Sequence, residues 1–154
     1  DVRLIFVMRD PIIRTWSALR NSMKKGRIDP YSSVEDLIEL SLQPSIASRS
    51  DYLHAIQMVE SKFGADQLHC WFFEQLIAEP TVFADSIFKF LGVNPLGEDL
   101  VIPAAVNSAA GGDQPPLALQ RALAKEYLPM TDQLADRFGG IPREWATKYR
   151  KLLG

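Results

Sequence analysis

Two arginines and a serine share one short segment whose chemistry suits binding of an anion. Arg9 precedes the dipeptide Asp10-Pro11, and Arg14 and Ser17 follow within the next two helical turns. Arginine offers a permanently charged fork of N–H donors that matches a phosphate group, and a serine hydroxyl can donate to the same group. A helix beginning at Pro11 would add free backbone N–H groups and the positive end of its dipole. The segment therefore suits a phosphate.

A strand and an amphipathic helix must position these side chains. Leu4 to Met8 is an unbroken apolar run, typical of a strand that is buried on both faces of a parallel sheet. Asp10 is a favourable N-cap and Pro11 suits the first helical position, so the helix begins directly after Arg9. Ligands of open α/β sheets bind at such carboxyl ends of strands. The expected helix has an apolar stripe made of Ile12, Trp16, Leu19 and Met23. Its opposite, polar face is made of Arg14, Ser17 and Asn21. Contact with solvent alone explains that polar face equally well.

The complete pattern resembles the 3′-phosphate-binding segment of the sulfotransferases that use 3′-phosphoadenosine 5′-phosphosulfate (PAPS). In that family a buried strand leads into Arg-(Asp/Asn)-Pro, followed by an arginine and a serine at the spacing of Arg14 and Ser17. The resemblance implies that Arg9 and Ser17 hold the 3′-phosphate of PAPS, the sulfuryl donor. It implies a sulfotransferase that acts on a hydroxyl or amine of a small-molecule or glycan acceptor. It assigns no catalytic residue to this chain.

The resemblance extends to about residue 93. Ser50 to His54 opens a helix as the middle segment of the family does, and Leu68 to Phe73 is an apolar run that predicts the next parallel strand. After it come Glu74-Gln75-Leu76, Glu79-Pro80 and Phe90-Leu91-Gly92, in the family's order of Glu-x-Leu, x-x-Pro and Phe-Leu-Gly. The implied fold class is α/β, part of a P-loop-like three-layer fold with a parallel sheet that is mostly helical in this portion.

The resemblance also predicts how the chain is organised. Residues 1–154 correspond to the C-terminal portion of a single sulfotransferase domain, with residues 1–93 as the 3′-phosphate-binding part, 94–116 as a loop and 117–154 as C-terminal helices. Pro129 is expected to interrupt these helices, and the last one is expected to start at Trp145. Earlier in the chain, Ser32 and Glu35 fit a capping box before a helix over residues 34–42.

A phosphosulfate-binding loop, which carries a basic residue and a Ser/Thr in the family, has no counterpart in this sequence. Gly111-Gly112 is glycine-rich but no Lys-Ser/Thr follows it, so it is no Walker-type loop. We expect that loop and the catalytic base to lie upstream of Asp1, and the chain alone to be inactive. We also expect it to pair with that upstream segment or with a second copy, because its two strands need neighbours.

Composition limits the remaining partners. Seventeen Lys and Arg against 19 Asp and Glu give a net charge of −2, which favours neither nucleic acid nor an anionic membrane. No apolar run approaches the length of a membrane span. Cys70 is the only cysteine and lies in an apolar run, which predicts an inert, buried thiol and a cytoplasmic location. His54 and His69 lack the spacing of metal ligands, so we expect no metal.

Two other functions fit parts of the pattern. A nucleotide-binding or P-loop kinase-like domain could carry a similar arginine-bearing turn, and it would prefer ATP. A non-enzymatic helical interaction module would use Arg9 and Ser17 only as surface residues, and it would bind no nucleotide. Glu74 follows a predicted strand and could act as a general base, but a structural role in capping the next helix is the stronger interpretation.

Overall fold

The computed structural model of the chain describes residues 2–94 and 114–154, which form two compact units. The first unit contains the described residues of 1–9 and 55–112, and the second contains those of 10–54 and 113–154. Most of the predicted loop over residues 94–116, with Gly111-Gly112, lies outside the described residues. Within the described ranges, no helix is long and apolar enough to cross a membrane.

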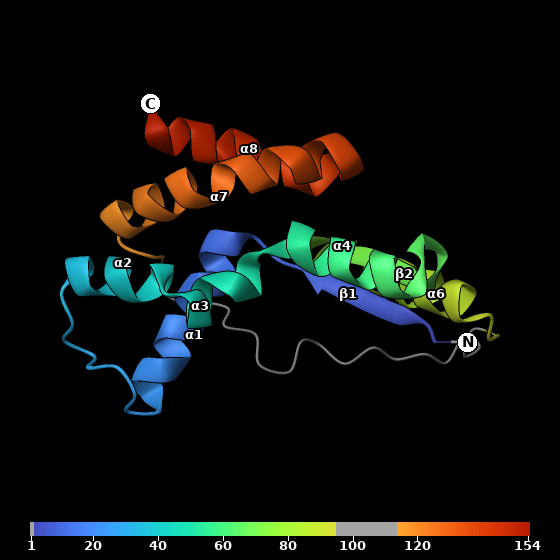
Figure 1. The fold of residues 1–154 in the computed structure, drawn as a ribbon, viewed down its shortest axis with the longest axis horizontal. Coiled ribbons are helices and arrows are strands. Elements are labelled where there is room, and N and C mark those ends of the chain that lie inside the picture. The colour runs from blue at the N-terminus through green and yellow to red at the C-terminus, as the bar shows by residue number, and fades with distance from the viewer. Residues whose placement is uncertain (1, 95–113) are drawn as a thin grey trace. The chain divides into compact units, whose positions relative to one another are not determined.

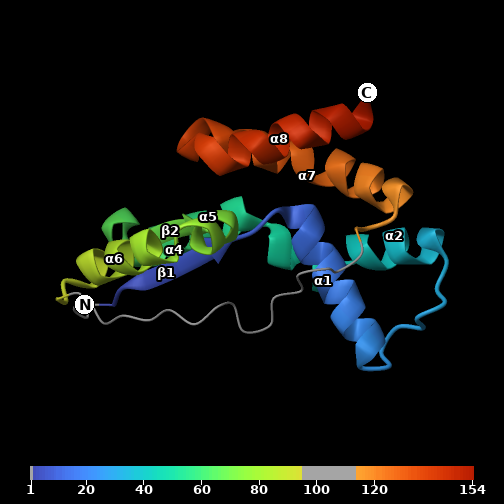
Figure 2. The ribbon, with the colours of Figure 1, turned by 180° about the vertical axis from the view of Figure 1, so that it is seen from behind.

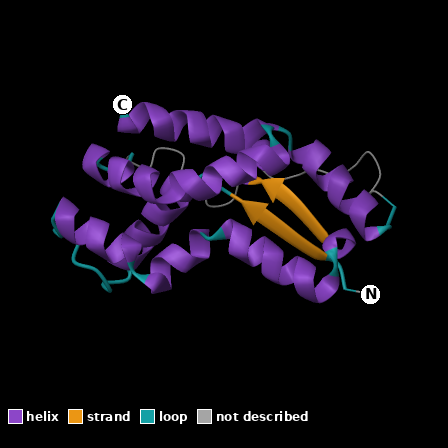
Figure 3. Cartoon of the chain, turned by 45° about the horizontal axis from the view of Figure 1, so that its top comes forward, coloured by secondary structure: helices purple, strands orange, loops and turns teal. Residues whose placement is uncertain are grey.

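The first unit is built on two parallel strands, β1 (Leu4–Met8) and β2 (Leu68–Phe72). Leu4 lies opposite Leu68 and Met8 lies opposite Phe72, and Figure 3 shows the strands running in the same direction. This pairing confirms the predicted parallel sheet. The expectation that β1 is buried on both faces is wrong for the described residues, since Ile5 and Val7 are 41% and 37% exposed. Successive side chains of a strand point to opposite faces, so these two share one uncovered face.

Helices precede and follow β2 in the chain, and the two that follow it pack against it. These helices are α4 (Tyr52–Phe63), which begins in the second unit, α5 (Phe73–Ala78) and α6 (Pro80–Leu91), with a 3₁₀ turn at Ala65–Gln67. The ring of Phe83 meets Trp71 edge-on at 5.7 Å between centroids, and Phe90 stacks on His69 at 5.0 Å. These aromatic pairs anchor α6 to the strand. The helix ends at Gly92, whose φ of +70° favours glycine.

The regular elements of the second unit are all helices in its described residues. It contains α1 (Pro11–Lys24), α2 (Val34–Leu42), α3 (Pro44–Ala47), a 3₁₀ turn at Ser48–Ser50, α7 (Leu117–Phe138) and α8 (Gly140–Leu153). The last two helices lie side by side in Figures 1 and 2. Helix α1 contributes Ile12 and Leu19 to a core whose other members include Leu119, Leu123, Leu134, Trp145 and Tyr149.

Three sequence expectations about these helices are wrong in detail. Helix α7 continues through Pro129, because neighbouring residues such as Tyr127 and Thr131 are buried and hold the helix on both sides of the proline. The capping box is formed by Ser33 and Asp36, one residue later than expected. Helix α8 begins at Gly140, five residues before Trp145.

Candidate functional site

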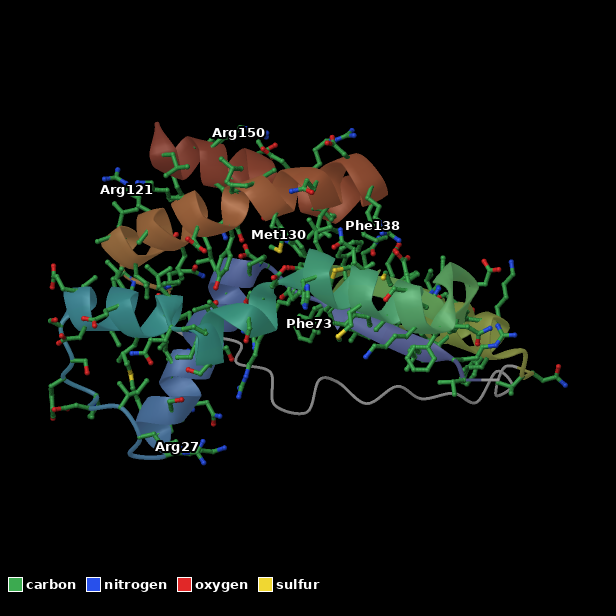
Figure 4. The ribbon with its side chains drawn as sticks, in the orientation of Figure 1. Arg27, Phe73, Arg121, Met130, Phe138 and Arg150 are labelled. Atoms are coloured by element: carbon green, nitrogen blue, oxygen red, sulfur yellow. The ribbon has the colours of Figure 1, made fainter. Side chains whose placement is uncertain are left out.

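Arg9 lies where the two parallel strands end. It follows the last residue of β1, and Phe73 follows the last residue of β2, so the register brings them together. The guanidinium carbon of Arg9 lies 4.8 Å from the centroid of the Phe73 ring, which is labelled in Figure 4. This cation–π contact helps to hold the Arg9 side chain in place, and it leaves the charge on the cation intact. A positive charge is thus held at the carboxyl end of the sheet.

Asp10 caps α1, as the sequence predicts. Its Oδ1 accepts hydrogen bonds from the backbone N–H groups of Ile12 at 2.9 Å and Ile13 at 3.3 Å. Asp10 is only 5% exposed, and its carboxylate fixes the start of the helix. It also occupies two of the N–H groups that the sequence offered to a ligand. An anion near this turn must therefore rely chiefly on side chains.

Two residues of α8 hold the Asp10 carboxylate as well. The hydroxyl of Tyr149 donates to Oδ1 at 2.7 Å, and Nζ of Lys148 donates to Oδ2 at 2.8 Å. Burial, followed by the negative charge of Asp10, raises the pKa of Tyr149, so this side chain stays a neutral donor. Sequence reasoning missed both residues, because they lie almost 140 positions from Asp10. The sequence offers one general signal, which is that the last helix is basic and carries Lys148, Arg150 and Lys151.

Arg14 turns out to serve a different purpose from Arg9. It is half-buried and donates to the Ser50 hydroxyl at 3.1 Å. Next to it, the Thr15 hydroxyl contacts Ser50 at 3.4 Å and the Tyr127 hydroxyl at 3.0 Å. Burial lowers the pKa of Arg14. This network ties α1 to the 3₁₀ turn and to α7, so Arg14 is not simply part of a solvated polar face.

Ser17 and Asn21 are exposed on α1, away from the packed residues Ile12 and Leu19. An exposed hydroxyl at the second turn of a helix is available to a ligand. Ser17 belongs to the second unit and Arg9 to the first. Their shared role in binding a phosphate stays a prediction.

The structure also places the other candidate residues that the sequence suggested. His69 contacts the Ser86 hydroxyl at 3.1 Å and stacks between aromatic rings, and burial lowers its pKa. Glu74 lies in the first turn of α5, whose N-cap is Phe72, and its expected capping role stays a prediction. Cys70 is partly exposed, not fully buried. The described residues contain no group of three or more His, Cys, Asp or Glu side chains that could hold a metal ion.

The strand, the cation after it and the capped helix follow one another in the order on which the resemblance to sulfotransferases rests, and comparison with known proteins supports this family. Residues 1–104 match the sulfotransferase domain family, and the chain belongs to this family. Its fold is similar to that in the crystal structure of a sulfotransferase from Alicyclobacillus acidocaldarius, with a TM-score of 0.65 and 19% sequence identity. The similarity covers 93% of this chain and 57% of that chain. The predicted P-loop-like α/β fold class is thereby confirmed. A search among curated proteins found no match.

Proposed function

We propose that the protein transfers a sulfuryl group from PAPS to a hydroxyl or amine of a small-molecule or glycan acceptor. In this proposal Arg9 and Ser17 bind the 3′-phosphate of the nucleotide. Membership of the sulfotransferase domain family supports the reaction class. Because the chain spans 57% of the sulfotransferase that it resembles in fold, the activity is proposed for the whole protein and not for these residues alone.

The observation that carries the proposal is the position of Arg9. The residue lies at the carboxyl end of the parallel strands, its side chain is restrained by Phe73, and the next residue caps α1. Such a restrained, permanently charged fork suits a phosphate that must be held in one orientation. Ser17 supplies an exposed hydroxyl on the helix that starts there.

These residues would anchor the nucleotide, while the reaction occurs at its other end. Bound PAPS supplies the sulfuryl group, whose transfer depends mainly on positioning and on donors directed at its oxygens, as in phosphoryl transfer. Fixing the 3′-phosphate restricts the nucleotide and so helps to orient that group. Arg14 is not assigned as a ligand in this scheme, since it is half-buried and one of its N–H groups donates to Ser50.

Calorimetric titration of the full-length protein with adenosine 3′,5′-bisphosphate, AMP and ATP tests the proposal. The bisphosphate is the desulfated product of PAPS, and we expect it to bind at least about tenfold more tightly than AMP, since a charge-assisted contact contributes about 1.5–3 kcal/mol. Preference for ATP would indicate the kinase-like alternative. Binding of no nucleotide would indicate an interaction module.

Arg9→Ala should weaken binding of adenosine 3′,5′-bisphosphate by about 10- to 100-fold, because it removes a charge-assisted contact. Arg3→Ala is the matched control, since the Arg3 guanidinium lies 5.2 Å from the Phe90 ring centroid in the same unit and plays no part in the proposed site. The same titration applies to both variants. Equal losses would contradict the role of Arg9.

Ser17→Ala should weaken binding of the bisphosphate by about fivefold and leave binding of AMP unchanged, because the contact exists only with the 3′-phosphate. Asn21→Ala, one turn further along the exposed face of α1, is the control. If Ser17→Ala affects both nucleotides equally, its hydroxyl does not contact the 3′-phosphate.

A further inference from the structure

The negative charge of Asp10 at the start of α1 opposes binding of a phosphate by Ser17 on the same helix. Asp10 places a buried carboxylate at the N-terminus of the helix. Ser17 lies seven residues further on, which corresponds to about 10 Å along a helix. Over such a distance a carboxylate and a doubly charged phosphate repel each other by an amount that affects affinity. Some compensation of the Asp10 charge is therefore needed.

Lys148 has the position that such compensation requires. Its ammonium group lies 2.8 Å from Oδ2 of Asp10, in the same unit as Ser17. The side chain of Lys148 is 42% exposed, while the Asp10 side chain is 7% exposed. Tyr149, the next residue of α8, donates to the other carboxylate oxygen at 2.7 Å. The carboxylate is thus held from α8 by one charged and one neutral donor.

We propose that Lys148 is a positioning residue of the nucleotide site, acting through Asp10 without touching the nucleotide. It cancels the negative charge at the start of α1, and together with Tyr149 it keeps the carboxylate turned onto the helix. This inference rests on the proposed function, since it concerns binding of the 3′-phosphate. Through the charge of Lys148, helix α8 at the far end of the chain would thus influence binding of the phosphate.

Titration of full-length variants with adenosine 3′,5′-bisphosphate and AMP tests this inference. Lys148→Met should weaken binding of the bisphosphate by about fivefold at about 20 mM salt, with binding of AMP changed less. The loss should shrink at about 500 mM salt, where exposed charges are screened within a few ångströms. Lys148→Arg keeps the charge and should bind like the wild type. A merely structural role of Lys148 would not depend on salt in this way.

Removing the opposing charge gives an independent test. Asn caps a helix about as well as Asp, so Asp10→Asn in the Lys148→Met background should restore affinity to within about twofold of the wild type. Lys151→Met is the matched control, because Lys151 is exposed one turn away on α8 and lines the same surface groove as Lys148. It should change affinity by less than about twofold.

The possible results separate this inference from the proposed function. Suppose that the wild type prefers the bisphosphate. If Lys148→Met and Lys151→Met then lose affinity equally, or if the double variant binds no more tightly than Lys148→Met, the role of Lys148 is refuted and the proposed function stands. If the wild type itself does not prefer the bisphosphate to AMP, the proposed function fails and the inference fails with it. Thermal unfolding of each variant shows whether it is folded. If Lys148→Met does not fold, Asp10→Asn alone tests the inference, because it should bind the bisphosphate at least as tightly as the wild type.

Discussion

Two arginines five positions apart in one motif have different environments. Arg9 lies over an aromatic ring at the end of the sheet, and Arg14 is half-buried and donates to Ser50. The same residue type thus supplies a candidate ligand in one position and a structural contact in the other. The Asp10 carboxylate, held by Tyr149 and Lys148, shows further that the start of α1 depends on side chains from α8.

Because of Tyr149, the free energy of unfolding should decrease at alkaline pH. Burial and Asp10 raise its pKa, so the folded state keeps a proton that the unfolded chain loses above about pH 10. Because the folded pKa is the higher one, this contribution is fully present below pH 10 and is lost as the pH rises beyond it. The free energy of unfolding should then fall by about 1.4 kcal/mol per pH unit from this residue alone.

Tyr149→Phe should therefore be less stable than the wild type at pH 8, by about 1–2 kcal/mol, and the difference should narrow above pH 10. Urea denaturation at pH 8, 9, 10 and 11 measures this difference. Tyr31→Phe is the control, because Tyr31 is 92% exposed. A difference that stays constant across this pH range would show that the proton on Tyr149 is not involved.

The helices differ in how far local sequence explains them. Helix α1 has its signals in place, with Asp10 as N-cap and Pro11 at the first position. Helix α7 does not follow its local sequence, because it continues through Pro129, a residue type that usually interrupts a helix. Proline in a helix interior removes one backbone hydrogen bond and crowds the preceding turn. Packing of buried residues on either side of Pro129 outweighs this cost.

Pro129→Ala should stabilise the protein by about 1–3 kcal/mol, because alanine restores the missing N–H and removes the steric conflict, while a more flexible unfolded chain offsets part of the gain. Pro129 is exposed, so the change should not disturb the core. Thermal unfolding of the variant and the wild type measures the difference. A lower midpoint for the variant would mean that α7 needs the bend that proline introduces.

At the scale of the whole molecule, the sheet of the first unit leaves apolar surface uncovered. Ile5 and Val7 lie on one exposed face of β1, and in the described part of the chain the sheet has only two strands. An exposed apolar face with unpaired strand edges favours association with another chain. We propose that pairing with another copy or with a further segment of the protein covers it.

The 154-residue polypeptide, produced alone, should consequently self-associate in a concentration-dependent way. Sedimentation velocity over a hundredfold concentration range measures this, and the double variant Ile5→Lys with Val7→Lys should shift the population toward the monomer. Ile77→Lys is the control, because Ile77 is 53% exposed on α5 and not on the sheet. A monomeric wild-type polypeptide throughout the range would contradict the expectation.

Local signals in the sequence were sufficient for several features. Continuous apolar runs predicted both strands and their parallel pairing, because such runs are typical of strands in parallel sheets. Asp10-Pro11 predicted the start of α1, since an N-cap acts on N–H groups two or three residues away. The order of these elements, with Arg9 and Ser17 among them, was enough to indicate the sulfotransferase family that comparison confirms.

Contacts between distant residues were decided only by the tertiary structure. Nothing near Asp10 in the sequence indicates Lys148 or Tyr149, and nothing near Arg14 indicates Ser50, because these partners meet only when the helices of the second unit pack. The continuation of α7 through Pro129 has the same origin. Propensities and caps act over a few residues, whereas burial and ion pairing depend on which surfaces the folded chain brings together.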